Sequence, residues 1–136
     1  MSLRAIPLIV IAFILYNLIV LAGGGVGGLD ATIFQMKLLS QGVWTFRWGD
    51  LIILITLILL FIEIVKSTYT TTSTLIDHGL SMLVFIACGV EFLVVPQAAT
   101  SVFFIIMAAT LIDVVAGYTI GMRAARRDIS FGQQDN

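Results

Sequence analysis

Four ionisable residues lie in or beside long apolar stretches of this sequence, where a charge is costly and needs a physical reason. They are Glu63, His78, Glu91 and Asp113. Asp113 is the clearest case, because it lies about 20 Å along a helix from Thr100 and about 15 Å from Arg123, close to the middle of a membrane span. No basic side chain is expected at that depth. The acid is therefore protonated, hydrogen-bonded to a neighbouring helix, or facing water.

Small residues share a helix face with Asp113. Ala109, Gly117 and Gly121 follow one another at multiples of four residues, and Gly117 and Gly121 form a GxxxG sequence, which allows two helices to pack closely. Two interpretations therefore stand side by side. Asp113 is either a neutral carboxyl group bonded across a helix interface or a proton or ion site.

A second set of polar and small residues lies on one face of the preceding predicted helix. Asp77, Ser81, Val84, Cys88 and Glu91 fall at i, i+4, i+7, i+11 and i+14, so they share one helix face that is expected to meet the bundle or a partner. Glu91 lies near the C-terminal end of its helix, where the helix dipole disfavours a negative charge. Arg47 or water is the expected partner for the carboxylate of Glu91. Cys88 is predicted to be inert packing.

Glu63 has a local and a longer-range interpretation. It precedes Lys66 by three residues, and an i, i+3 ion pair is the simpler of the two. His78 begins the next apolar stretch at a similar depth, so a Glu63–His78 proton relay is the functional alternative. A lone histidine near a helix end is more often an interfacial hydrogen-bonding residue.

The apolar stretches fix the fold class. The chain has 136 residues, of which 60% are hydrophobic and 11% charged, and its mean hydropathy is +1.10. Stretches that are apolar on every side are typical of membrane spans. We predict a single-domain, all-α integral membrane protein with four transmembrane helices at about 5–22, 50–66, 75–95 and 100–122, followed by a polar tail at 123–136 whose last residues are loose. The first stretch is longer than the apolar core of a signal peptide, which favours a retained span over a cleaved one.

The only long loop, residues 29–49, is predicted to contain a short interfacial helix that begins at Asp30. Trp44, Phe46 and Trp48 follow just before the second span. Aromatic rings at this position are typical of the belt that anchors a protein at headgroup level. A platform for an aromatic ligand is the less favoured alternative.

Basic residues predict the orientation. With four spans, five of them share a side, namely Arg4, Lys66, Arg123, Arg126 and Arg127, whereas only Lys37 and Arg47 lie on the other. This bias places both termini in the cytoplasm, and the small size and topology suggest a bacterial inner membrane.

Several function classes lack any sequence support. A net charge of −1 gives no footprint for nucleic acid. A single cysteine and a single histidine cannot build a His/Cys metal site in one chain. Phosphate-binding loops, nucleophile elbows and metalloprotease helices are missing from the sequence. We therefore expect neither an enzyme, nor a cofactor, nor a metal ion.

Two hypotheses for function remain. The favoured one is a non-enzymatic accessory, assembly or stabilising subunit of a membrane complex, or a homo-oligomer of that kind, with lipid and other subunits as partners. The alternative is a homo-oligomeric proton- or cation-coupled transporter or channel, with Asp113 as the midplane site, Glu91 as the outer acid, and Glu63 with His78 as the inner relay. In size and span count the chain resembles the small multidrug transporters. That family uses a glutamate in the first span, where residues 5–22 contain no acid, so its activity is not carried over.

Overall fold

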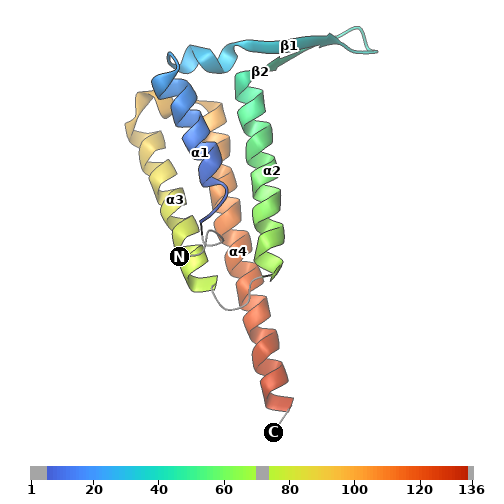
Figure 1. Cartoon of the computed structure of the whole chain (residues 1–136), viewed down its shortest axis with the longest axis vertical. Coiled ribbons are helices and arrows are strands. Elements are labelled where there is room, and N and C mark those ends of the chain that lie inside the picture. The colour runs from blue at the N-terminus through green and yellow to red at the C-terminus, as the bar shows by residue number, and fades with distance from the viewer. Residues whose placement is uncertain (1–5, 70–73, 135–136) are drawn as a thin grey trace.

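The computed structural model describes residues 6–69 and 74–134, with the side chains at 74–78, 121 and 124–134 outside the description. The elements are mostly helical (Figure 1). In chain order they are helix α1 (Val10–Asn17), the π-helical turn η2 (Leu18–Ala22), the 3-10 turn η3 (Val26–Asp30), strands β1 (Thr32–Lys37) and β2 (Val43–Arg47), helix α2 (Trp48–Tyr69), helix α3 (Thr74–Val94), the 3-10 turn η4 (Pro96–Ala98) and helix α4 (Ser101–Gln134).

The predicted helical fold is confirmed in its coarse form. The four helices run side by side, and α4 packs along both α2 and α3 (Figure 1). Helix α2 and the Ser101–Ile120 part of α4 are long and apolar enough to cross a membrane. Val10–Ala22 and Gly79–Val94 are shorter apolar helices.

The predicted interfacial helix after Asp30 is wrong. Strands β1 and β2 form an antiparallel hairpin there, with Phe34 opposite Phe46 and Met36 opposite Trp44. Ile33 and Met36 have a helical spacing, but the strand period of two places Phe34 and Met36 on one face. The β-branched residues of the two segments also favour strands.

The predicted polar tail is helical through Gln134. Helix α4 continues to Gln134 and extends beyond the ends of the other helices (Figure 1). Its 34 residues correspond to about 51 Å, against about 33 Å for the 22 residues of α2. A helix that has already formed adds further residues easily, because the costly step is its nucleation.

The core gathers around the first turns of α4. Phe103 is fully buried, and its ring lies 5.0 Å from that of Tyr16 and 6.3 Å from that of Phe92. Cys88 and Ile106 belong to the same buried cluster. This cluster joins α1, α3 and α4 at the end of the bundle where the hairpin begins.

Tyr16 also ties α1 to the turn between α3 and α4. Its hydroxyl donates to the carbonyl oxygen of Gln97 at 2.7 Å and lies 2.6 Å from Thr100 Oγ1. Thr100 Oγ1 in turn accepts from the backbone N–H of Phe103 at 3.2 Å. Thr100 is thus the side-chain cap at the start of α4.

Replacing Tyr16 with phenylalanine tests this attachment. The ring packing survives, but the Gln97 carbonyl and the Thr100 hydroxyl lose their buried partner. We expect Tyr16→Phe to lower the free energy of unfolding by about 1–3 kcal/mol. Denaturant unfolding in a mild detergent measures the change. Tyr69→Phe is the matched control, because the Tyr69 side chain is exposed, and equal stability of the two variants would contradict the role of the Tyr16 hydroxyl.

Candidate functional site

An inner cluster of polar side chains forms where α2, α3 and α4 meet. Asp113 on α4 is only 4% exposed, and its carboxyl group accepts a hydrogen bond from the Ser81 hydroxyl on α3. Glu63 on α2 is equally buried and lies close enough to interact with the charge of Asp113. The Oδ2 atom of Asp113 is buried and has no hydrogen-bond partner among the described residues. The structure therefore brings Asp113, Glu63 and Ser81 together.

Glu63 holds the start of α1 against α2. Its Oε1 atom accepts from the backbone N–H of Leu8 at 2.8 Å and lies 2.9 Å from Lys66 Nζ. Lys66 Nζ also donates to the carbonyl oxygen of Ile6 at 3.5 Å, a long bond. The structure contains the ion pair between Glu63 and Lys66, which was the simpler interpretation of Glu63. The bond to Leu8 also attaches the segment before α1 to α2.

Lys66 acts on the charge of Asp113 from a distance, while its direct contacts are with Glu63 and with the carbonyl oxygen of Ile6. The side chain of His78 lies outside the described residues, so a relay between Glu63 and His78 stays a prediction.

An outer cluster joins α1 to α3. Asn17 Nδ2 donates to Glu91 Oε2 at 3.3 Å and to the carbonyl oxygen of Phe13 at 2.9 Å. The partner of Glu91 in the structure is therefore Asn17, where the sequence suggested Arg47 or water. Glu91 lies about 15 Å along α3 from Ser81. The structure consequently does not bring Glu91 into contact with Asp113.

The small-residue face of α4 packs inside the chain. Ala109 is buried against Ile9 and Leu60, and Gly117 is also buried. Ser81 and Cys88 on α3 are buried too. Gly121 lies outside the described side chains. The described residues of this face, Ala109 and Gly117, are thus buried within the chain.

The aromatic residues lie at the opposite end of the bundle from the inner cluster. Trp44 and Phe46 belong to strand β2, and Trp48 is the first residue of α2. Trp44 and Trp48 are exposed. Asp50 accepts from the backbone N–H of Arg47 at 3.0 Å, in the first turn of α2. Sequence reasoning found these rings but missed the hairpin that carries two of them.

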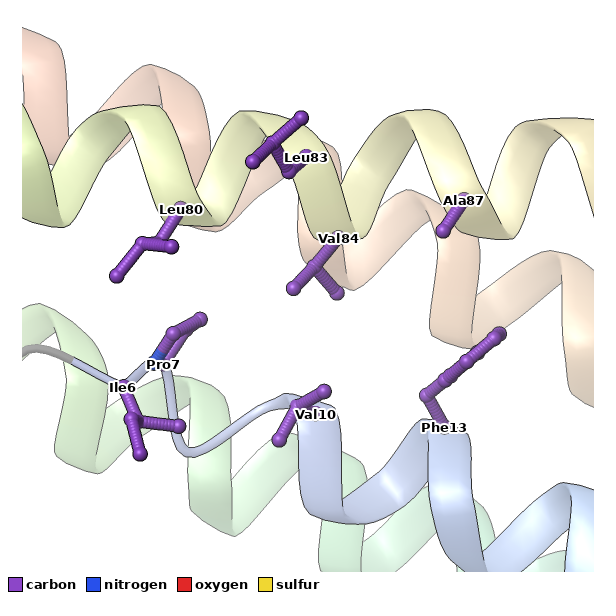
Figure 2. A pocket seen from close by; sticks show the side chains of 8 residues that line it. All are labelled: Ile6, Pro7, Val10, Phe13, Leu80, Leu83, Val84 and Ala87. Atoms are coloured by element: carbon purple, nitrogen blue, oxygen red, sulfur yellow. The ribbon is translucent and has the colours of Figure 1, made fainter.

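Two of the hollows on the surface of the bundle are relevant to the site. The first, of about 280 Å³, lies between α1 and α3 and is lined by apolar side chains (Figure 2). They are Ile6, Pro7, Val10, Phe13, Leu80, Leu83, Val84 and Ala87. The second, of about 260 Å³, lies at the root of the hairpin and includes Asp30, Arg47 and Asp50. Neither hollow is lined by Asp113, Glu63 or Glu91.

Among the described side chains, no three of His, Cys, Asp and Glu gather in a way that could hold a metal ion. Comparison with known proteins adds no assignment: no family model, no curated protein and no solved structure matches this chain. Its function is therefore inferred from its own geometry.

The buried position of Gly117 generates a second prediction. A leucine there would overfill the packed interior, so we expect Gly117→Leu to lower the free energy of unfolding of the single chain by about 1–3 kcal/mol. The measurement is denaturant unfolding in detergent at a concentration where the chain is monomeric. Gly89→Leu is the matched control, since a side chain at Gly89 meets open space. A Gly117→Leu chain that unfolds like wild type but fails to oligomerise would contradict intrachain packing.

Proposed function

We propose that this chain crosses a bacterial inner membrane four times, with both termini in the cytoplasm, and serves as a non-enzymatic accessory, assembly or stabilising subunit of a membrane complex. Support for the spans comes from the length and apolar surface of α2 and α4 and from the apolar helices that pack beside them. The basic residues near the span ends support the orientation.

The polar side chains of the bundle support a stabilising use. Tyr16, Asn17 and Glu63 each bond to a different part of the same chain. Asp113 does so through Ser81. Bonds of this kind hold helices at fixed positions where water is scarce. None of the four residues lines the apolar hollow between α1 and α3 or the hollow at the root of the hairpin.

The observation that carries the proposal is the length of α4. Its last twelve residues, 123–134, continue as a helix past the ends of α2 and α3 (Figure 1). This stretch avoids the cost of nucleation because it continues α4, but no other described helix runs beside it (Figure 1), and most of the stability of a protein helix comes from packing. A surface on another subunit would stabilise it, and the three arginines in this stretch, Arg123, Arg126 and Arg127, favour an acidic surface.

A proline inside the extension tests this proposal. Ala125→Pro removes a backbone donor and clashes with the preceding turn, at a cost of about 3 kcal/mol to the helix, while the bundle lies outside its reach. Native mass spectrometry of the protein extracted gently from its own membrane gives the readout. We expect wild type and the control Ala125→Ser to carry further subunits in fixed stoichiometry, and Ala125→Pro to lose them while its bundle melts at an unchanged temperature. A wild-type chain that runs alone, or a proline variant that keeps the same subunits, would contradict the proposal.

A second candidate function, proton- or cation-coupled transport by a homo-oligomer, is favoured by one observation. Asp113 Oδ2 is buried without a partner, and acids within a membrane commonly mark ion or proton paths. The separation of Glu91 from Asp113 weighs against a continuous path within one chain. The bonds of Glu63 to Leu8 and Lys66 also give that acid a structural use.

Proton flux in liposomes decides between the two functions. If Asp113 carries transport, Asp113→Asn should reduce the flux by about tenfold or more, since the amide keeps the shape but cannot release a proton. Asp50→Asn is the control, because Asp50 is an exposed acid at the start of α2. Equal flux for wild type and Asp113→Asn would remove the transport function.

A further inference from the structure

The β1–β2 hairpin has one aromatic face. Cross-strand partners and alternate residues of a strand point to the same side, and Phe34 pairs with Phe46 while Met36 pairs with Trp44. The ring of Phe34 lies 5.0 Å from that of Phe46 and 5.4 Å from that of Trp44. We call these four side chains, Phe34, Met36, Trp44 and Phe46, the aromatic face.

The opposite face of the hairpin carries mostly polar side chains, together with Val43, which pairs with Lys37 and is exposed. Gln35 pairs with Thr45, and Gln35 Nε2 donates to Thr45 Oγ1 at 3.4 Å. Lys37 and Arg47 follow on the same side at a spacing of two. The hairpin therefore separates two cations and two hydrogen-bonding side chains from its aromatic rings. A division of this kind is typical of an element that lies between an apolar and an aqueous phase.

The bundle does not cover the aromatic face. Trp44 is 45% exposed and Met36 is 51% exposed, and at the tip of the hairpin Leu39 is completely exposed. An isolated two-stranded hairpin is only marginally stable in water. Its exposed rings and leucine also leave apolar surface in contact with water, which is unfavourable. The described part of the chain therefore leaves this face open to another molecule.

The root of the hairpin fixes its level along the bundle. Strand β2 ends at Arg47 and α2 begins at the next residue, Trp48, whose backbone N–H donates to the carbonyl oxygen of Ala31 at 3.1 Å. The hairpin extends sideways, across the helix axes, from the end of the bundle where α2 begins (Figure 1). It therefore lies at the level where the long apolar helices would enter a bilayer.

We propose that the aromatic face rests in the lipid bilayer, at the boundary between headgroups and acyl chains; this inference rests on the membrane placement proposed above. Aromatic rings favour that layer. The outer edges of a two-stranded hairpin carry backbone groups that need water, which keeps the hairpin out of the hydrocarbon core. Lys37 and Arg47, on the other face, are then available to lipid phosphate groups.

The two tryptophans of the chain allow a direct test. Trp48→Phe leaves Trp44 as the only tryptophan in the full-length protein. The variant is reconstituted into phosphatidylcholine–phosphatidylglycerol nanodiscs whose acyl chains are brominated either near the headgroup or near the chain end. We expect blue-shifted emission that falls by about twofold or more with bromine near the headgroup, because the ring lies at that depth, and a smaller loss with bromine near the chain end.

Two further reporters, each placed in a chain with Trp44→Phe and Trp48→Phe, serve as controls. Thr45→Trp puts the ring on the polar face of the same hairpin, so we expect little quenching by bromine and strong quenching by aqueous iodide. Phe61→Trp puts it on the exposed apolar side of α2, where Phe61 is 68% exposed, and it reports on the span itself. Bromine near the chain end should quench this second reporter strongly.

The outcomes separate the inference from the membrane placement. Quenching of the Phe61→Trp reporter together with an iodide-accessible Trp44 would overturn the inference and leave the span intact. A blue-shifted Trp44 that neither bromine position quenches would overturn it in favour of a protein, either a second copy or another subunit, covering the aromatic face. If brominated lipid quenched neither Trp44 nor the Phe61→Trp reporter, the membrane placement itself would be overturned.

Discussion

Polar groups inside an apolar helix bundle need partners within the chain, because water and lipid do not supply them. Most of the arrangement of α1 follows from this constraint. At one end Glu63 accepts from the backbone N–H of Leu8. At the other end Tyr16 and Asn17 bond to Gln97 and Glu91. Helix α1 is short, and packing alone would leave its ends weakly fixed, so these bonds set its position along the bundle.

The same constraint changes how the acids are interpreted. Glu63 and Glu91 are both joined to another helix or its lead-in segment, which is a sufficient reason for each to be present. Asp113 differs, since the bond from Ser81 serves the carboxyl group while its Oδ2 atom is buried without a partner among the described residues. Because this buried atom has no described partner, a transport function stays a candidate beside the accessory role.

Local signals in the sequence predicted local features well. Hydropathy located the helices, and the Glu63–Lys66 spacing predicted an ion pair that the structure contains. The bonds between Asn17 and Glu91 and between Ser81 and Asp113 could not be predicted, because the order of helices around a bundle is not readable from one chain. The hairpin was missed because a strand is defined by its partner. Residues 32–37 alone fit a helical and a strand period about equally well, and only their pairing with 43–47 decides between them.

The small-residue motif shows why composition alone does not identify an interface. A GxxxG sequence favours close helix packing, but the partner can be another helix of the same chain. Here Ala109 and Gly117 are buried within the bundle, so they give no evidence for assembly. Contacts with other molecules must then use what the bundle leaves uncovered, which includes its apolar flanks, the hairpin and the end of α4. The hairpin is aromatic and lies across the helix axes, which suits lipid, whereas the end of α4 is rich in arginine and projects along them, which suits a protein subunit.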